Sequence, residues 1–468
     1  MITEGPRLRD LTARAFAPVD AASLDCFRLA FGAVMAWEVV RYFSNGWIAS
    51  YFIEPQFHFT YFGFGWVRPW PGPGMYLHFA VLGLAALGIM AGLLYRLSAL
   101  VFFLGFSYVF LLDEARYLNH FYLIILLSFT LIFLPLNGAL SLDARRRPAL
   151  RSDSAPAWAL WLLRAQVGIP YLYGGLAKVN RDWFQGEPLR TWLAARANLP
   201  VLGPMLTEDW VVSLFVYGGV LLDLLIVPLL LWRRSRPWAF AAGLLFHGLN
   251  AILFDIGVFP WLMMAATTLF FPPCWPRQVR LLPARRPQSL DPSARPPVGR
   301  AAAVLAAASA YLLVQALLPL RHYAYPGDVS WTEEGHRFSW HMKLRDKEAQ
   351  GQFLITDPED GRTWTVRPSA YLTVWQYPKM AAQPDMILQF AHYLAGRFRA
   401  AGHSRVEVRA RVTASLNGRR PQLLIDPTMD LAAEPRSLRP APWILPLREP
   451  LSERATARAP RLGGSVEE

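Results

Sequence analysis

Long apolar stretches are the feature that most constrains what this chain can fold into. Segments such as 73–94 and 210–232 are mostly apolar, and a helix of about 20 apolar residues crosses the hydrocarbon core of a bilayer. Charged residues make up only 17% of the 468 residues, against about 25% in a typical soluble protein. A soluble fold of this composition would expose large apolar patches, so we expect an integral membrane protein.

Nine segments have this apolar character. In chain order they are 22–43, 73–94, 97–113, 119–137, 157–178, 210–232, 237–254, 256–272 and 301–320. The neighbouring segments 237–254 and 256–272 can be two spans or one re-entrant hairpin, so we expect eight or nine spans.

The positions of the arginines predict how these spans are oriented. The formal net charge of +13 would by itself also suit an acidic partner such as nucleic acid. If every segment crosses once, however, the basic clusters all fall on the same side as the N-terminus. They surround residues 7–14, 96, 145–151, 233–236 and 277–300. By the positive-inside rule that side is cytoplasmic, so we expect a bilayer and no nucleic acid as partner.

Polar segments flank the spans. The first 21 residues form a polar cytoplasmic segment without an evident cleavable signal, so the first span of the membrane domain (22–320) is expected to be an uncleaved anchor. Residues 273–300 are a linker rich in Pro and Arg, and residues 448–468 are predicted to be a disordered tail. Residues 321–447, which lie between the last span and this tail, would be outside the cytoplasm.

The residue pattern changes to that of a small folded domain after the last span. Segments 337–344 and 351–357 alternate like strands. Segment 383–402 reads as an amphipathic helix, and Asn417-Gly418 is a strong hairpin turn. The predicted fold is therefore an integral membrane α-helical bundle followed by a small extracytoplasmic α+β domain.

Several polar side chains interrupt the apolar spans near one surface, and such residues are costly in a bilayer and mark candidate functional sites. Asn119 and His120 begin the fourth span at its outer end, and Lys178 ends the fifth span there. Asn250 lies near the outer end of segment 237–254, and His247 lies about 12 Å below that end at 1.5 Å per residue. The pattern favours a membrane pocket under the exported domain, where a lipid-soluble ligand meets a water-soluble one. A structural His120 and a snorkelling Lys178 remain alternatives.

Two further charges lie deeper in the spans. Arg164 is about 21 Å below Lys178, and Asp223 is about 20 Å below the start of its own span. The matching depths predict an ion pair between Arg164 and Asp223 that ties two neighbouring helices together.

Metal and disulfide chemistry have little support in the sequence. Cys26 and Cys274 are the two cysteines, which is too few for a disulfide framework or a Cys-rich metal site. No His, Cys and Asp residues have the spacing of metal ligands, so no metal is expected.

At these polar residues the sequence resembles the vitamin K-dependent γ-glutamyl carboxylase family, whose membrane part is also called the horizontally transferred transmembrane domain. Seven stretches match in order between about residues 24 and 446. They are "YRLSALVFFLGFSYVFLLDEARYLNHFYL", "LLRAQVGIPYLYGGLAKVNRDWFQG", "GGVLLDLL", "FHGLNAILFDIGVFPW", "EEGHRFSWHMKL", "DGRTW" and "IDPTMDL". The chain looks like a bacterial member, which implies a multi-pass protein of the bacterial inner membrane.

The resemblance implies a membrane enzyme with two coupled activities. Vitamin K hydroquinone (reduced menaquinone or phylloquinone) is oxygenated by O2 to the epoxide, and the base so generated removes a γ-proton from a peptidyl glutamate, which then captures CO2. The implied enzyme is a peptidyl-glutamate 4-carboxylase, a carbon–carbon lyase, with vitamin K epoxidase activity. Its implied partners are the quinone and a glutamate-containing peptide or protein. A quinone epoxidase or oxidase without carboxylation, and a non-catalytic transporter or scaffold, are the alternatives.

The resemblance also implies roles for individual residues. The family's catalytic lysine falls on Lys178 in a K-x-x-x-D-W stretch, and its Asn-His pair falls on Asn119 and His120. A lysine acts as a base near neutral pH when an apolar surrounding favours its neutral amine. His120 would then hydrogen-bond the oxygenated cofactor or the substrate carboxylate, with Asn119 holding it in place.

The remaining implied residues belong to binding. The "FH..N" stretch carries His247 and Asn250 as cofactor-binding residues, and the "FSWHM" stretch carries Trp340 and Met342 toward the glutamate substrate.

Overall fold

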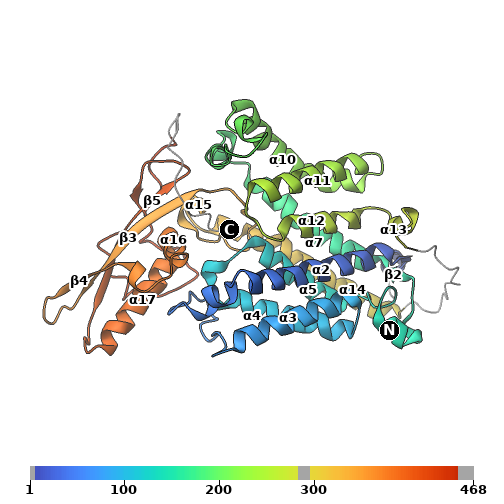
Figure 1. Cartoon of the computed structure of the whole chain (residues 1–468), viewed down its shortest axis with the longest axis horizontal. Coiled ribbons are helices and arrows are strands. Elements are labelled where there is room, and N and C mark those ends of the chain that lie inside the picture. The colour runs from blue at the N-terminus through green and yellow to red at the C-terminus, as the bar shows by residue number, and fades with distance from the viewer. Residues whose placement is uncertain (1–5, 283–295, 452–468) are drawn as a thin grey trace.

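The computed structural model describes residues 6–282 and 296–451. It shows a bundle of helices with a sheet-containing unit at one end (Figure 1). Part of the predicted linker, 283–295, and most of the predicted disordered tail, 452–468, lie outside the described residues.

Helices occupy the nine apolar segments. They are α2 (Ala22–Ser44), α3 (Gly74–Ala91), α4 (Tyr95–Leu112), α5 (Asn119–Phe133), α7 (Ala157–Ala177), α10 (Asp209–Leu231), α11 (Arg236–Leu253), α12 (Phe259–Thr267) and α14 (Val298–Leu317). Shorter elements connect them: α1 (Pro6–Ala15), β1 (Pro18–Asp20), α6 (Leu142–Arg146), β2 (Ser154–Pro156), α8 (Arg181–Phe184), α9 (Leu189–Ala194), α13 (Trp275–Gln278) and α15 (Val329–Thr332).

Among the described residues, four helical segments are long and apolar enough to cross a membrane. They are Gly74–Ala91, Tyr95–Leu112, Asp209–Leu231 and Val298–Ala324. Other helices are too polar or too short to meet this criterion of length and apolar content. For example, α2 carries Asp25, Arg28, Glu38 and Arg41, and α5 and α12 are short. The chain is therefore a membrane protein, and the count of eight or nine spans stays a prediction.

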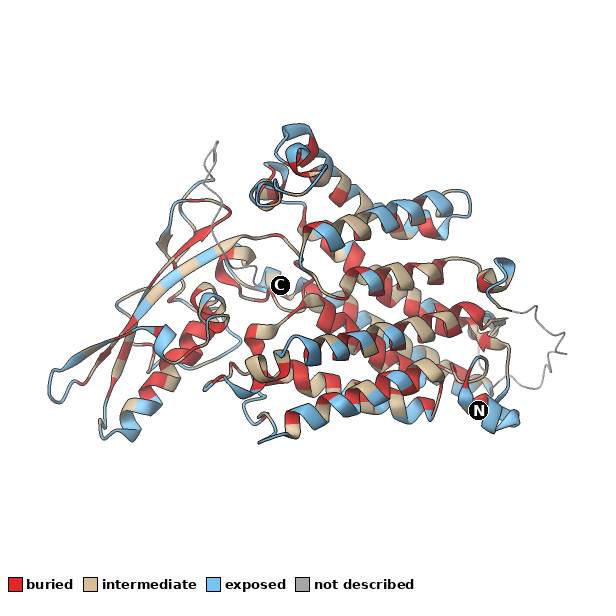
Figure 2. Cartoon of the chain, viewed as in Figure 1, coloured by how far each residue is buried: buried red, intermediate tan, exposed pale blue. Residues whose placement is uncertain are grey.

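The helices pack as a single bundle with an apolar outer surface. α2 contacts α3 and α12, α4 lies between α3 and α5, and α7 contacts α5, α10 and α14. Figure 2 shows buried residues where the helices face one another and exposed residues on the outward faces of α10 and α11. Those faces carry large apolar side chains, since Leu221 is 57% exposed and Leu245 is 65% exposed. Such a surface suits lipid rather than water.

The described loops that carry basic clusters, around residues 96, 145–151 and 233–236, lie toward the end of the bundle away from the sheet (Figure 1). Arg277 pairs there with Asp20 at 3.0 Å and with Asp153 at 3.3 Å. The backbone N–H of Ser23 donates to the carbonyl of Pro273. The bundle therefore has a basic end and an end covered by the sheet-containing unit, and the cytoplasmic placement of the basic end remains a prediction.

The C-terminal unit is a four-stranded antiparallel sheet with two helices. Its strands are β3 (Lys347–Thr356), β4 (Thr363–Val366), β5 (Glu407–Leu416) and β6 (Gln422–Leu423), in the order β4-β3-β5-β6. The helices α16 (Gln376–Ala382) and α17 (Pro384–Ala400) pack on β3 and β5. The predicted helix and the predicted hairpin at Asn417-Gly418 are confirmed, because Phe390 and Leu394 of α17 are fully buried and β5 and β6 flank the turn.

The prediction of a strand over 337–344 is wrong. Phe338, Trp340 and Lys343 have backbone φ angles of 66°, 60° and 51°, which lie in the left-handed region and break the alternation of a strand. Contacts with the bundle outweigh the local strand pattern, since the N–H of Phe338 donates to the hydroxyl of Tyr117 at 2.7 Å. The segment therefore forms an irregular wall against the bundle.

Charged hydrogen bonds fix the C-terminal unit to the bundle. Arg419, after the β5 strand, donates to both carboxylate oxygens of Asp182 at 2.6 and 2.7 Å, and Asn417 donates to the same carboxylate. Burial raises the pKa of Asp182, but the hydrogen bonds from Arg419 and Asn417 outweigh burial and lower the pKa below its usual value. The contact therefore stabilises the fold above the ordinary carboxyl pKa and weakens as acid protonates Asp182.

We expect Arg419→Ala to destabilise the folded protein by about 2 kcal/mol, because it leaves Asp182 without its bidentate partner in a partly buried site. Thermal unfolding in detergent micelles measures the effect. Arg420→Ala is the matched control, since the neighbouring Arg420 is exposed. Equal unfolding midpoints for the two variants would contradict the proposed role of this contact.

Candidate functional site

A large cavity lies between the bundle and the C-terminal unit. Its empty volume is about 1330 Å³, including the part that opens to solvent. On the bundle side its lining includes the predicted residues Asn119, His120, Lys178, His247 and Asn250. The structure thus brings together five side chains from three helical segments, α5, α7 and α11, that the sequence placed near one surface.

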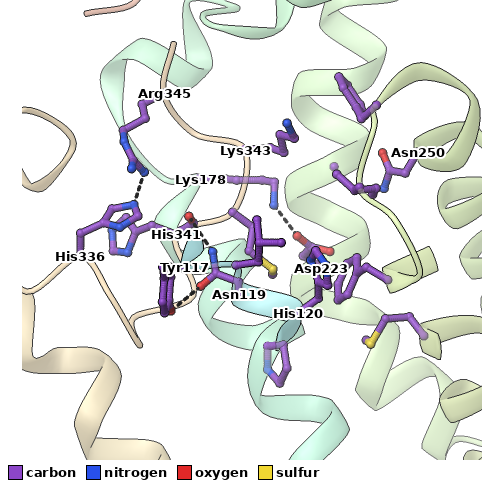
Figure 3. A pocket seen from close by; sticks show the side chains of 18 of the residues that line it. Tyr117, Asn119, His120, Lys178, Asp223, Asn250, His336, His341, Lys343 and Arg345 are labelled. Carbon is purple, nitrogen blue, oxygen red and sulfur yellow. Dashed lines mark hydrogen bonds and ion pairs between the residues drawn. The ribbon is translucent and has the colours of Figure 1, made fainter. Parts of the chain in front are cut away.

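Lys178 and Asp223 form a buried ion pair in the wall of this cavity. The Nζ of Lys178 lies 2.5 Å from Oδ2 of Asp223 and also donates to the carbonyl of Gly174 at 3.2 Å. Lys178 is 6% exposed and Asp223 is 5% exposed. Figure 3 shows the two side chains pointing toward each other from α7 and α10. Lys178 therefore does not snorkel to water.

The predicted ion pair between Arg164 and Asp223 is wrong. Arg164 donates instead to the carbonyls of Leu269 and Phe271 at 2.8 and 3.1 Å. Asp223 forms its ion pair with Lys178. The depth estimate failed because each helix was measured from its own end, and α10 passes α7 at a different height. Asp223 therefore lines the cavity, whereas the sequence predicted only a structural ion pair for it.

Two consecutive glycines let α7 and α10 approach closely at this pair. A Cβ at Gly175 would lie 2.7 Å from Cδ2 of Leu224 and 3.1 Å from Cβ of Asp223. A Cβ at Gly174 would lie 3.5 Å from Oδ2 of Asp223 and 3.1 Å from Cε of Met342. Side chains at these positions would push Asp223 away from Lys178.

Asn119 links the start of α5 to the C-terminal wall. Its amide nitrogen donates to the carbonyl of His341 at 3.3 Å, and its amide oxygen accepts from the hydroxyl of Tyr117 at 3.1 Å (Figure 3). Asn119 therefore holds the wall segment in place rather than the ring of His120, which was its expected partner.

His120 is buried among aromatic rings and faces the cavity. Its ring lies 4.9 Å from the ring of Phe121 and 6.0 Å from that of Phe259. No hydrogen bond to the ring is formed by the residues that the structure describes. Its nitrogens are thus available to a ligand or to water.

His247 and Tyr171 form a hydrogen-bonded pair deeper in the cavity. The Nε2 of His247 lies 2.6 Å from the hydroxyl of Tyr171, and the Nδ1 of His247 is buried without a partner among the described residues. The hydrogen bond between Tyr171 and His247 can run in either direction. In both cases the Nδ1 atom of His247 remains without a hydrogen-bond partner among the described residues. Tyr171 was not predicted, because its sequence surroundings resemble an ordinary apolar helix. Asn250 lines the same region.

The wall segment places Met342 and Trp340 differently. Met342 lines the cavity, and its role in substrate binding stays a prediction. Trp340 is completely buried in the bundle core, with its ring 5.1 Å from that of Tyr122, and does not line the cavity. The left-handed backbone at Trp340 turns its side chain inward, so the prediction that it contacts substrate is corrected to a supporting position.

The C-terminal side of the cavity is basic. Arg337, Lys343, Arg345 and Lys379 line it together with His336 and His341. Burial lowers the pKa of His341 to about 3, and burial together with Arg345 lowers the pKa of His336 well below its usual value. Both histidines are therefore neutral near pH 7, and the Lys and Arg residues supply the positive charge. The sequence feature that could have predicted this basic side is the pair Lys343 and Arg345, which directly follows the matched "FSWHM" stretch.

A group of possible metal ligands lies in the C-terminal unit, outside this cavity. Atoms of Asp357, Asp360 and His403 lie within 4.8 Å of one another. The carboxylates are already occupied, since Asp357 accepts from Glu359 and His403, and Asp360 accepts from the backbone of Arg362. The arrangement is accounted for by the turn between β3 and β4.

Comparison with known protein families matches both parts of the chain. Residues 16–275 match the HTTM domain, and residues 300–450 match the lumenal domain of vitamin K-dependent gamma-carboxylase. The chain belongs to the vitamin K-dependent γ-carboxylase family. No solved structure gives a significant match. The lumenal-domain match indicates that the C-terminal part of this family member lies topologically outside the cytoplasm.

The family implies dependence on vitamin K, and the cavity suits such a group. Its bundle side is lined by apolar side chains, which suit a naphthoquinone ring and its isoprenoid tail: Phe215, Phe246, Phe254, Ile256, Phe259 and Met263. The unsatisfied position of the His247–Tyr171 pair is available to a ring hydroxyl. These residues would hold the group beside Lys178.

We expect Gly175→Ala to destabilise this family member by about 1–3 kcal/mol, because the new methyl group overlaps Leu224 and forces α10 from α7. Thermal unfolding in detergent measures the change. Gly218→Ala in α10 is the control, since a Cβ there meets nothing within 4 Å, and it should leave stability unchanged or slightly raised. Similar unfolding curves for the two variants would disprove close α7–α10 packing at Gly175.

Proposed function

We propose that this protein is an integral membrane enzyme that carboxylates peptidyl glutamate at the γ-carbon, coupled to oxygenation of vitamin K hydroquinone to the epoxide by O2. The observation that carries the proposal is the buried Lys178–Asp223 pair in a cavity that is apolar on the membrane side and basic on the C-terminal side. The family match supports the carboxylase class. The proposed setting is the bacterial inner membrane.

The two sides of the cavity suit two different reactants. An apolar quinone enters from the bilayer side, and a peptide carboxylate is attracted to the basic C-terminal side. Reduced vitamin K, when bound, supplies the strong base for proton removal by being oxygenated. The protein supplies the binding positions and controls the protons.

Lys178 is the proposed initiating base. In a buried ion pair, transfer of the proton from the ammonium to the carboxylate replaces two charges with two neutral groups, which lowers the desolvation cost. Asp223 can therefore take the proton of Lys178 and leave a neutral amine at Nζ. That amine can accept the proton of a ring hydroxyl held beside it.

His120 and Asn119 are the proposed companions of Lys178. The ring of His120 has no hydrogen bond to any described residue, so it can donate to a developing negative charge in the cavity. Asn119 fixes the carbonyl of His341, which keeps the basic wall in position over that charge. His247 and Asn250 are the proposed contacts of the cofactor, and Met342 that of the substrate.

Lys178→Ala should abolish both the epoxide and the carboxylated product, with at least about a 1000-fold loss of rate, because no other group replaces the initiating base. The assay uses purified full-length protein, reduced vitamin K, labelled CO2 and a Glu-rich peptide. Arg181→Ala, an exposed neighbour, should behave as the wild type.

Two results of this assay would change the proposal. If the wild type forms epoxide without labelled peptide, the activity is that of a quinone epoxidase. If Lys178→Ala still forms epoxide at the wild-type rate, Lys178 is not the initiating base.

Lys343→Met should raise KM for the peptide by about tenfold with kcat nearly unchanged, because a cation in a partly enclosed cavity contributes about 1.4 kcal/mol to carboxylate binding. Lys343 lines the cavity beside the rings of Trp192 and Phe254. Arg399→Met, at an exposed position of α17, is the control. An unchanged KM for Lys343→Met would remove this residue from substrate binding.

A further inference from the structure

A second, smaller cavity lies behind His120. Its empty volume is about 250 Å³, including its opening, and the space inside suits about one water molecule. Its lining is mostly polar at one end and includes Glu38, Arg41, Arg116 and Asp255. His120 lines this cavity as well as the large one, so its imidazole ring is a shared wall between them.

The geometry at Gly257 shows which edge of His120 faces the small cavity. A Cβ at Gly257 would lie 3.8 Å from Nε2 of His120 and 3.1 Å from Nη1 of Arg41. Gly257 has a φ of 55° and lines the small cavity. The Nε2 atom and the guanidinium of Arg41 therefore approach the same small space.

A buried carboxylate also lines this space. Glu38 of α2 is 5% exposed and pairs with Arg41 at 2.7 Å. The two guanidinium groups are fixed by aromatic rings, with Arg41 4.9 Å from the ring of Trp47 and Arg116 3.7 Å from that of Tyr51. Glu38 is thus a carboxylate held inside the protein beside the small cavity, where its oxygens can accept a proton.

The small cavity meets the protein surface at Asp255, which lines it. The side chain of Asp255 is 51% exposed and pairs with Arg196 at 2.9 Å. Three titratable groups therefore line the small cavity, between the large cavity and solvent: the imidazole of His120, the carboxylate of Glu38 and the carboxylate of Asp255.

The proposed reaction requires such an exit, and the inference rests on that proposed function. Carboxylation breaks the γ-C–H bond of glutamate and uses its electron pair for a new C–C bond to CO2, giving a carboxylate and one proton. Oxygenation of the hydroquinone by O2 gives the epoxide and water without net release of a proton. One proton must therefore leave the buried site for each glutamate carboxylated.

We propose that the small cavity is the proton exit of the carboxylation site. His120 receives the proton on the side of the large cavity and releases one from Nε2 into the small cavity. Water carries it to the carboxylate of Glu38, and it reaches solvent beside Asp255. Glu38 is a positioning and relay residue that touches neither substrate nor cofactor.

Steady-state and first-turnover carboxylation by full-length protein in lipid nanodiscs test the exit. Glu38→Gln keeps the shape of the side chain but removes the proton acceptor. We expect the first turnover to stay at the wild-type rate and later turnovers to slow by about tenfold, because the released proton is retained. Added imidazole buffer should restore the later turnovers by carrying protons, and Glu38→Asp should retain most of the activity.

The controls separate this inference from the proposed function. Asp10→Asn removes an exposed carboxylate paired with Arg14 within another helix and should have no effect on turnover. If the wild type forms no carboxylated peptide, the proposed function fails and the exit with it. If the wild type is active and Glu38→Gln either turns over normally or is slow without rescue by imidazole, only the proton exit is overturned.

Discussion

The close contact of Lys178 with Asp223 is the interaction on which the rest of the site depends. Two opposite charges on residues that are only 6% and 5% exposed are tolerated in an apolar bundle only as a hydrogen-bonded pair. Their 2.5 Å separation requires α7 and α10 to touch, and Gly174 and Gly175 make that contact possible. Helix packing, charge burial and proton chemistry are thus set by the same few residues.

The second constraint is the attachment of the C-terminal unit to the bundle. Glu114, at the outer end of the bundle, pairs with Arg337 at 2.7 Å and with Arg436 at 3.0 Å, and Asp182 pairs with Arg419. The contact of Arg337 holds the irregular segment 337–344 against the bundle, where it forms a wall of the cavity, and the other two fix the rest of the C-terminal unit. The basic half of the site is therefore positioned by ion pairs that lie outside the cavity's apolar half.

Much of the architecture could be predicted from the sequence because helix length, apolar content and arginine position are local properties. The nine helical segments and the grouping of Asn119, His120 and Lys178 follow from them. The partner of Asp223 could not be predicted, since it depends on the relative heights of two helices. The inward turn of Trp340 could not be predicted either, because the bundle imposes a left-handed backbone on a strand-like pattern.

The wall over the cavity comes late in the chain, and this affects how the protein is made. Lys178 and Asp223 are synthesised well before residues 337–344, so the nascent bundle holds its buried ion pair without its cover until the last helix and the sheet have emerged. During that interval the bundle side of the cavity lacks the residues of segment 337–344 that line it in the complete structure. Completion of the C-terminal unit is therefore the step that adds the second wall of the cavity to the membrane-inserted bundle.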